Sequence, residues 1–414
     1  MLKKIKFLFT LALVVRLLLA FGTYHSDAAV FPFAGRVIFT GHAGDFYDYL
    51  WDLPDNAPEL KIYPRNLFNY PPVTYFSLGT VSGILTAPLG GFVDEFIYNL
   101  EDTFGDIRLN ILLLVIKLPL LAFDLGTLYF LLKMFEKESQ KKAVYILWLF
   151  NPVNLYATYM MGMYEIIPVF FVVASLYFAK KRGKLASALM LGLGASFKIF
   201  PLMFLVPLSA TTSDWRERLK IFAAGFGVYI ISILPFLGST GFRQTALVAG
   251  QTMKSLYLTL PISGGEAIIP YLALYIFFSL AFLINKGNAQ VLWKRYFYIL
   301  LLFFMLTHYH PQWFLWITPF FIYDFVYSKY KNWLVLAIAL FSYFGLITLF
   351  DPGLSTRLFA PIFPHLYEAP GLWELLGIRF DLNFARSVLH TLFVGAALYW
   401  FVYYKSSLYS KPKS

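Results

Sequence analysis

Long apolar runs, separated by short basic or polar segments, dominate the pattern of this chain. Runs such as 111–132 and 333–350 approach the length of about 20 residues that an α-helix needs to cross the hydrocarbon layer of a membrane. A chain with 59% hydrophobic and 14% charged residues is also far from the composition of soluble domains. The pattern therefore predicts an all-α integral membrane protein.

We expect about 12 transmembrane segments, counted by length and hydrophobicity. They are 6–23, 109–132, 143–161, 166–180, 185–197, 199–210, 221–238, 266–285, 295–307, 312–326, 332–350 and 384–404. The hairpins 185–210 and 295–326 have arms too short to cross, since a helix of about 12 residues covers only roughly 18 Å. Their apices, 196–201 and 308–313, should then lie at bilayer depth, where polar groups need a water-filled cavity or an ionic partner.

The basic residues indicate the orientation of these segments. Clusters lie before the first apolar run and near 133–142, 180–184, 216–220, 286–295, 329–331 and 405–413, between runs that pair into out-and-back crossings. Cytoplasmic loops carry an excess of Lys and Arg, so we expect both termini in the cytoplasm and the active site on the extracytoplasmic side. The N-terminal run is expected to be an uncleaved helix, because Arg16 interrupts it and no clear cleavage site follows.

The chain shows no separable soluble domain. It divides into a first extracytoplasmic loop (24–108), a core transmembrane module (109–326) and a C-terminal transmembrane part (327–414). Residues 70–89 in the first loop are apolar and long enough to cross. A crossing there would invert every later loop, so we favour an interfacial or re-entrant helix.

Composition excludes several classes of function. The net charge of +11 comes from short clusters between apolar runs, which does not indicate nucleic-acid binding. The chain has no Cys, hence no disulfide, thiolate nucleophile or Cys-ligated metal. No glycine-rich phosphate loop supports a nucleotide site, so a transferase of this kind should use a lipid-linked donor.

Two acidic residues are candidates for catalysis. Asp27 follows the first predicted segment, where a carboxylate can act as general base on an acceptor hydroxyl. Glu165 lies in the turn between the third and fourth segments, on the same predicted face. The pair can divide base and orienting roles or bind a divalent cation. Each can also be an ordinary acid at the end of a helix.

Several cations are placed to hold an anionic group. Lys198 at the apex of the first short hairpin favours an anionic partner, for which a lipid phosphate is the natural candidate. Arg16 and Arg243 are further candidates for donor phosphate binding, although Arg16 can also extend toward the lipid head groups. Lys117 can instead pair with Asp124, two turns away on its own helix.

The second apex combines polar and aromatic residues. His308, His310 and Gln312 lie beside Trp313 and Trp316, an arrangement suited to a hydroxylated ligand that stacks on aromatic rings. Two histidines can also ligate a metal, but the motif has no nearby acid. A purely structural role for these polar groups remains the alternative.

Four motifs resemble GT-C superfamily glycosyltransferases that use polyprenyl-phosphate-linked sugars. The similarity is to the mannosyltransferase branch that includes the catalytic subunit of GPI mannosyltransferase I and bacterial relatives. The motifs are Asp27 with Tyr70-Pro71-Pro72, Leu149-Phe150-Asn151-Pro152 leading to Gly162 and Glu165, Lys198-Ile199-Phe200-Pro201, and His310-Pro311-Gln312-Trp313-Phe314-Leu315-Trp316 with Pro319.

The resemblance implies a GT-C-like fold and an inverting hexosyltransferase with Asp27 as base. It would transfer a hexose, in particular mannose, from a polyprenyl-phosphate donor to a lipid or glycan acceptor. Tyr70, His308, His310 and Gln312 are then candidates for sugar or acceptor binding. The family often has Asp-x-Asp in the first loop, whereas this chain has His25 at the first position, so the metal requirement stays open and no other cofactor is expected.

Two other classes of function remain alternatives. A transporter or flippase for a lipid-linked or anionic solute would also need intramembrane cations and broken helices. Its sequence sign would be an inverted internal repeat, which the chain lacks. A non-catalytic assembly subunit is the third possibility.

Overall fold

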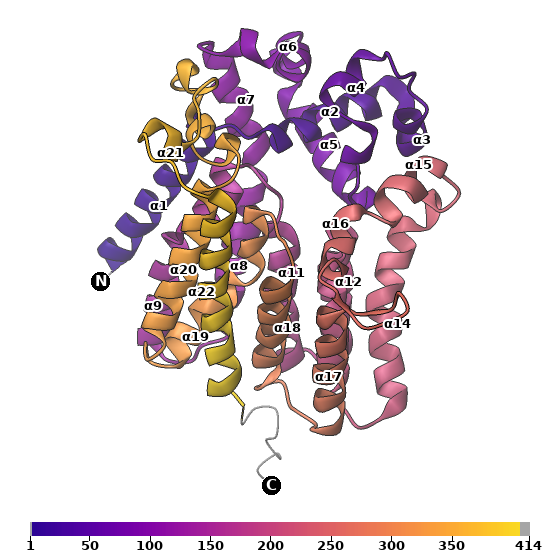
Figure 1. Ribbon diagram of the computed structural model, residues 1–414, viewed down its shortest axis with the longest axis vertical. Helices are drawn as coiled ribbons and strands as arrows, with labels where there is room; N and C mark the ends of the chain where they lie inside the picture. Colours follow the sequence, from indigo (N-terminus) through magenta and orange to yellow (C-terminus); the bar gives the residue numbers. More distant parts are fainter. Residues whose placement is uncertain (1, 406–414) are drawn as a thin grey trace.

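The computed structural model describes residues 2–405, apart from the side chains of residues 2, 3, 61, 251 and 252 (Figure 1). It is 74% helical. Within this range the only sheet is a two-stranded antiparallel ladder of β1 (Leu260–Pro261) and β2 (Ala267–Ile268), in which Leu260 lies opposite Ile268. The predicted all-α class is therefore confirmed. Lys411 and Lys413, in the C-terminal basic cluster, lie outside the described residues.

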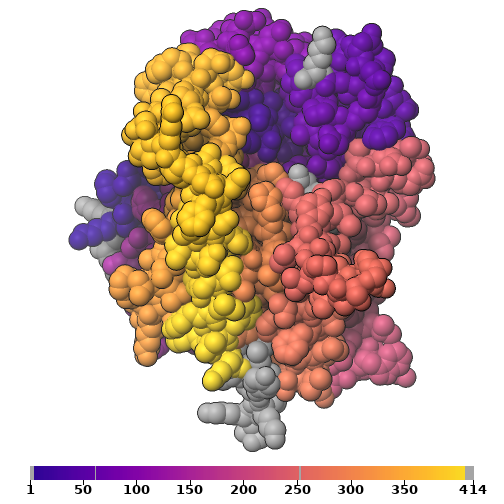
Figure 2. All heavy atoms as spheres, in the orientation of Figure 1, coloured from indigo at the N-terminus to yellow at the C-terminus, as the bar shows by residue number. Residues whose placement is uncertain are grey.

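One end of the molecule is a cap of short helices, which we call the head. It is built by residues 24–106 and packs on an aromatic core in which Phe33 stacks on Tyr63 and Phe46 on Tyr75, with ring centroids 4.3 and 5.5 Å apart. Figures 1 and 2 show the head above the bundle. Its helices are α2 (Val30–Val37), α3 (Phe46–Trp51), α4 (Pro58–Ile62), α5 (Pro72–Thr86) and α6 (Phe92–Tyr98).

The other part of the molecule is a bundle built mainly of longer apolar helices, most of which lie below the head, while helix 107–117 lies beside it (Figure 1). They are α1 (Leu2–Gly22), α7 (Ile107–Lys117), α8 (Leu120–Lys133), α9 (Glu138–Leu149), α10 (Pro152–Asn154), α11 (Ile166–Lys181), α12 (Lys184–Phe197), α13 (Leu205–Ser209), α14 (Trp215–Ile233), α17 (Pro270–Ile284), α18 (Leu292–Leu306), α19 (Thr318–Tyr327), α20 (Trp333–Thr348) and α22 (Leu382–Tyr403). The loops at the head end contain α15 (Thr240–Phe242), α16 (Gly250–Met253) and α21 (Leu372–Leu375).

Several of these helices are long and apolar enough to lie in a membrane. In the described part of the chain, four meet the length of a crossing: Lys4–Gly22, Ile107–Lys133, Trp215–Phe236 and Leu382–Tyr403. Shorter apolar helices include α12, α17 and α20. They support a membrane protein. Each of the twelve predicted segments contains helical residues, and residues 70–89 contain α5. The number of crossings and the orientation of the termini stay predictions.

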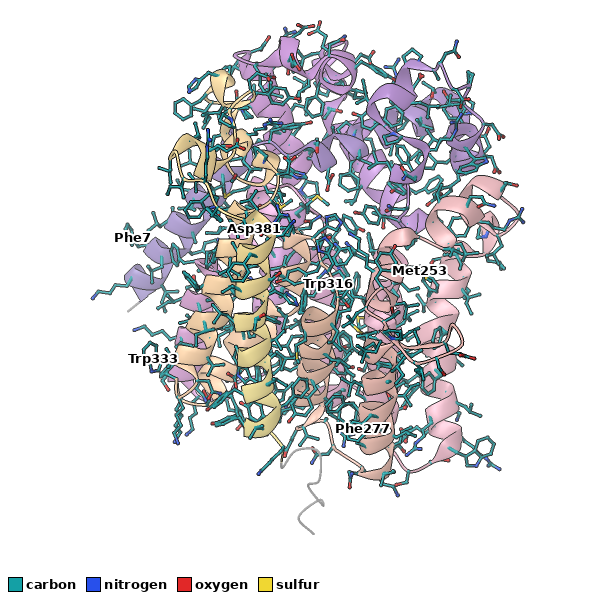
Figure 3. All side chains as sticks on the ribbon, in the orientation of Figure 1. Phe7, Met253, Phe277, Trp316, Trp333 and Asp381 are labelled. Carbon is teal, nitrogen blue, oxygen red and sulfur yellow. The ribbon has the colours of Figure 1, made fainter. Side chains whose placement is uncertain are left out.

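Small residues allow close packing in the bundle, and two of its helices end in irregular segments. A side chain on Gly192 of α12 would place Cβ 2.5 Å from the carbonyl oxygen of Gly225 on α14, so glycine allows these two backbones to touch. α12 ends at Phe197 and α18 at Leu306, and each is followed by a residue in an extended conformation, Lys198 and Thr307. The two irregular segments that result lie at the centre of the molecule, where Figure 3 labels Trp316.

Candidate active site

The end of α12 presents Lys198. The residue leaves the helix in an extended conformation, with φ −156° and ψ 129°. Thr74 of α5 donates a hydrogen bond to the carbonyl oxygen of Phe197 at 2.7 Å, which ties the head to this helix end. The C-terminal end of a helix dipole favours a cation, so the local structure suits an ammonium here.

Glu165 approaches Lys198 from a tight turn before α11. Gly162 in that turn has φ +72°, a conformation that side-chain-bearing residues rarely adopt. A Cβ on Gly162 would lie 2.8 Å from Cε of Lys117 and 3.3 Å from Cβ of Ala28, so the turn has little free space. Glu165 is the N-cap residue of α11, where the helix dipole favours a negative charge.

Lys198 and Glu165 form a buried ion pair inside an aromatic enclosure. Nζ of Lys198 lies 2.5 Å from Oε1 of Glu165, and the Glu165 side chain is fully buried. Nζ also lies 4.9–5.4 Å from four ring centroids, those of Tyr70, Tyr164, Trp313 and Trp316. Ring faces attract cations, so the enclosure stabilises the ammonium where water is excluded. Oε2 of Glu165 has no hydrogen-bond partner among the described residues.

The segment after α18 supplies the second set of polar groups. Nε2 of His310 lies 2.9 Å from Nζ of Lys254, which comes from the 239–265 loop. Burial, together with the charges of Lys254 and Lys198, lowers the pKa of His310 from 6.5 to about 3. The ring is therefore neutral near pH 7, and Nε2 accepts a hydrogen bond from the ammonium. Gln312 is buried, and its Oε1 has no partner among the described residues.

Asp27 lies on the head side of these groups. It is in a short 3-10 turn (Ser26–Ala29), and its backbone N–H donates to Nδ1 of His25 at 3.2 Å. Oδ2 of Asp27 lies 3.8 Å from the same ring nitrogen, and about a third of the side chain is exposed. The Asp27 carboxylate is close enough to interact electrostatically with Lys198 and Tyr70. The structure therefore brings this acid and this cation to one region.

Three hollows that share lining residues connect this region. A central cavity of about 210 Å³ is lined by Asp27, Tyr70, His310, Gln312 and Trp313. A mostly apolar groove of about 430 Å³ shares Tyr70 and Trp313 with it, and Lys198 is the only charged residue among those that line the groove. An outer cavity of about 550 Å³ in the head shares Asp27 with the central cavity. The site is thus apolar on one side and polar on the other.

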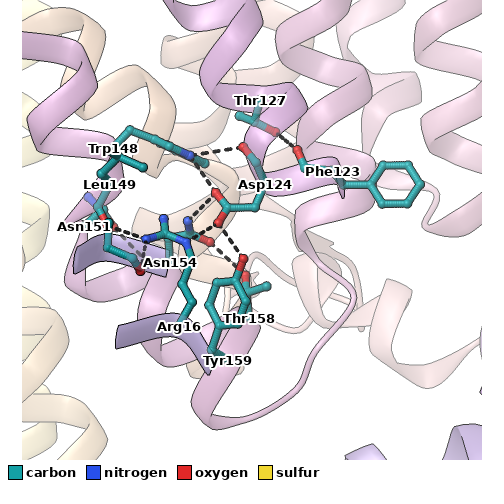
Figure 4. Close-up of polar contacts among 11 residues, drawn as sticks. Arg16, Phe123, Asp124, Thr127, Trp148, Leu149, Asn151, Asn154, Thr158 and Tyr159 are labelled. Atoms are coloured by element: carbon teal, nitrogen blue, oxygen red, sulfur yellow. Dashed lines mark hydrogen bonds and ion pairs between the residues drawn. The ribbon is translucent and has the colours of Figure 1, made fainter. Parts of the chain in front are cut away.

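Two of the predicted phosphate-binding residues lie elsewhere. Arg16 is buried, and its Nε lies 2.7 Å from Oδ2 of Asp124 (Figure 4). It also donates to the carbonyl oxygen of Leu149 at 2.7 Å. The guanidinium is thus engaged in the helix packing and lines none of the three hollows. Arg243 is exposed and bonds to its own loop, at the carbonyl oxygen of Leu237 and the hydroxyl of Thr240.

The predicted alternative for Lys117, a pair with Asp124, is wrong. Its ammonium donates instead to the carbonyl oxygens of Ala20, Thr23 and Met160. Asp124 accepts bonds from Trp148, Asn154 and Tyr159 in addition to Arg16, as Figure 4 shows. These buried networks tie α1 to α8 and to the segment 151–160, because most of the buried polar groups find partners on other segments of the chain.

His308 does not lie with His310 and Gln312, with which it was predicted to form one group. It lines a different cavity from His310 and Gln312, because consecutive residues of an irregular segment point in different directions. Lys254, in contrast, was not predicted from the sequence to be part of the site. Only its position, as one of two basic residues in the loop 239–265 that we predict to be extracytoplasmic, could have indicated it. Within residues 2–405, no group of three or more His, Asp or Glu side chains is placed to hold a metal ion.

Residues 107–307, just under half of the chain, match the model of Glycosyltransferase family 87. The match supports a membrane glycosyltransferase family and indicates glycosyltransferase activity. It implies sugar donor and acceptor substrates. It includes Glu165 and Lys198 but neither Asp27 nor Gln312. No curated protein and no solved structure matches the chain.

Proposed function

We propose that this membrane glycosyltransferase transfers a hexose, mannose in the first instance, from a polyprenyl-phosphate carrier to a lipid or glycan acceptor on the extracytoplasmic side. The observation that carries the proposal is the arrangement of the three hollows. An apolar groove with one buried ammonium meets a small central cavity, which in turn meets a polar outer cavity at a carboxylate. A lipid phosphate, a sugar and a hydroxyl acceptor suit this order.

The donor would bind with its chain in the apolar groove and its phosphate at the inner end. Lys198 is there, and the indole N–H of Trp316, which also lines the groove, has no partner among the described residues. Lys254 approaches Trp313 from the loop side, with Nζ 5.9 Å from the ring centroid. Two ammonium groups and one N–H donor can therefore share the charge of a phosphate that departs as a leaving group.

The transfer is a single displacement. The acceptor hydroxyl oxygen attacks the anomeric carbon while its proton passes to the Asp27 carboxylate. The bond between the anomeric carbon and the phosphate oxygen breaks, and that oxygen keeps the electron pair. The products are the new glycoside with inverted configuration, polyprenyl phosphate and a protonated Asp27, which releases its proton to the outer cavity.

The remaining polar groups position the reactants. Oε1 of Gln312 can accept a hydrogen bond from a sugar hydroxyl in the central cavity, because it has no other partner among the described residues. Neutral His310 is held by Lys254 and lines the same cavity. Glu165 is a positioning residue, since its contact is with Lys198. The proposed steps use no metal ion. The transfer assay tests separately whether a divalent cation is required.

The test is transfer of label by purified protein in lipid nanodiscs. The donor is radiolabelled polyprenyl-phosphate-mannose, and the acceptor source is a total lipid and glycan extract. We expect wild type to move label to a new species and Asp27→Asn to lose at least about 100-fold in rate, the range for loss of a general base. Asp52→Asn, an exposed head acid that lines none of the hollows, is the matched control and should transfer normally.

Other outcomes separate the alternatives. Equal transfer by Asp27→Asn would remove this residue from the role of base. Movement of the intact donor across the bilayer without transfer of label would favour a transporter or flippase. Faster transfer from polyprenyl-phosphate-glucose would keep the mechanism and change the sugar. Chelation of divalent cations in the same assay measures the metal requirement.

A further inference from the structure

The largest of the hollows described here plays no part in the mechanism above. It has a volume of about 630 Å³ and lies between the end of α18, the end of α20 and the beginning of α22, and we call it the α22 cavity. Asp381, which immediately precedes α22, is labelled in Figure 3, and Figure 2 shows α22 in yellow on the front face. His308 and Tyr309 line the α22 cavity, whereas His310 and Gln312 line the central cavity.

Three buried hydroxyl groups in the lining have no hydrogen-bond partner among the described residues. They belong to Thr307, Tyr309 and Tyr343, which are 2%, 7% and 1% exposed. Buried hydroxyl groups in native proteins nearly always find partners, because an unpaired one loses its bonds to water without replacement. Three such groups on one cavity indicate an occupant that carries hydrogen-bonding atoms.

Arg386 is the one permanently charged residue among those that line the cavity, and it is positive. Arg386 and His390 of α22 line it, and no Asp or Glu is among its lining residues. His308 lies within electrostatic range of Arg386, His390 and Lys254. Arg386 stacks on Phe350, with its guanidinium carbon 4.6 Å from the ring centroid, and donates to the carbonyl oxygen of Leu349. This fixed cation at the cavity favours an anionic ligand.

The rest of the lining is apolar. Met305 and Leu306 from α18 face Leu346 and Ile347 from α20. These residues lie at the ends of apolar helices, next to the polar lining residues Asn383, Ser387 and Thr391 of α22. A cavity with an apolar wall, a polar rim and positive charge matches the two parts of an amphiphile.

We propose that the α22 cavity binds an anionic amphiphile of the phospholipid type, with its phosphate at Arg386 and its chains along α18 and α20. Two kinds of molecule have this chemistry: a phospholipid of the surrounding membrane and a phosphate-bearing lipid acceptor. Only the second source rests on the proposed function. In either case the ligand contacts the turn that also carries His310 and Gln312.

Photolabelling tests this assignment. The full-length protein is placed in phosphatidylcholine nanodiscs with a trace of photoactivatable phosphatidylglycerol, and labelled peptides are identified by mass spectrometry. We expect label on 305–311 and 383–391 and suppression by unlabelled phosphatidylglycerol. Arg386→Gln should reduce labelling about tenfold, the effect of one lost charge-assisted hydrogen bond. Arg379→Gln, at an exposed arginine in the loop before α22 that does not line the cavity, is the matched control.

Two further variants keep the test independent of folding defects in Arg386→Gln. Ser387→Trp adds bulk at an exposed lining position of α22, and Thr307→Val removes one unpartnered hydroxyl without changing side-chain shape. Both should fold and lose label. Unchanged labelling in Ser387→Trp, no label on the two peptides, or equal labelling by a photoactivatable phosphatidylcholine would each overturn the proposal.

The source of the ligand is decided by competition. Suppression by unlabelled phosphatidylglycerol alone identifies a membrane phospholipid. Suppression also by the extract fraction that accepts sugar identifies the acceptor. Labelling is measured without donor, so a failure of the transferase assay leaves this result unaffected.

Discussion

The ion pair between Lys198 and Glu165 allows a catalytic role to be separated from a structural one. Lys198→Met removes the ammonium and keeps a side chain of similar length. It leaves the Glu165 carboxylate fully buried without its partner at 2.5 Å. Breaking one side of a buried pair typically costs about 3–5 kcal/mol of stability. The single variant is therefore expected to fold poorly, and its low activity would carry no information about catalysis.

The double variant Lys198→Met with Glu165→Gln removes both charges. Its stability should return to within about 1–2 kcal/mol of wild type, because no uncompensated charge stays buried. Its transfer rate should remain roughly 100- to 1,000-fold low if the ammonium stabilises the leaving phosphate, the range for loss of one preorganised donor. Glu165→Gln alone keeps the ammonium among its four rings but also breaks the pair, so it should lose stability as Lys198→Met does, and it is the matched single variant for the comparison.

The assay combines thermal unfolding of the purified proteins with single-turnover transfer from the labelled donor. A double variant that regains both stability and rate would contradict a catalytic role, since Lys198 would then serve only to neutralise Glu165. A double variant that regains stability alone would place Lys198 on the reaction path.

Three other perturbations follow from the same structure. Asp124→Asn leaves Arg16 unpaired in the bundle and should lower the free energy of unfolding by about 3–5 kcal/mol. Asp106→Asn breaks the exposed pair with Arg108, which water and salt screen, so its effect should be much smaller, and equal effects of the two variants in denaturant titrations would contradict the assignment. Gly162→Ala places a Cβ at φ +72° and 2.8 Å from Lys117, and it should lower the free energy of unfolding by about 1–3 kcal/mol. The loss should be larger than in Gly105→Ala, where φ is +88° but the surrounding space is open, and thermal unfolding of the two variants measures the difference. Burial and nearby cations lower the pKa of His310 from 6.5 to about 3, so between these pH values the unfolded chain binds more protons than the folded one. The contribution of His310 to stability is therefore complete above pH 6.5 and is lost as the pH falls toward 3. His310→Gln should flatten that part of the curve of stability against pH, and an unchanged slope would be inconsistent with a neutral ring.

Much of the fold was predictable because membrane insertion imposes simple demands on sequence. A helix in lipid must be apolar and must satisfy its own backbone hydrogen bonds, so the runs of hydrophobic residues indicate the helices directly. The breaks were readable as well, since the hairpins 185–210 and 295–326 have arms too short to cross, and α12 and α18 end inside them. The prediction that Lys198 needs an anionic partner rested on the same energetic argument, and the structure supplies Glu165.

The arrangement of the site depended on packing between distant segments. Arg16 and Lys198 are both cations in apolar surroundings, and their local sequences do not say that one faces Asp124 and the other a groove. Lys254 lies in a loop whose sequence contains no helix-like pattern, so its approach to His310 could not be read from spacing. His308 and His310 differ by two positions, yet the irregular turn directs them to different cavities.

Hydrophobic patterning alone was therefore enough to indicate a membrane protein, to locate its helices and to show that Arg16 and Lys198 need partners. Those properties follow from local hydrophobicity and from the high free energy of an unpaired charge in an apolar medium. The tertiary structure decided which charges pair with each other and which are left facing a hollow. That choice depends on how helices far apart in the chain pack, and packing is a property of the whole set of surfaces rather than of any one segment.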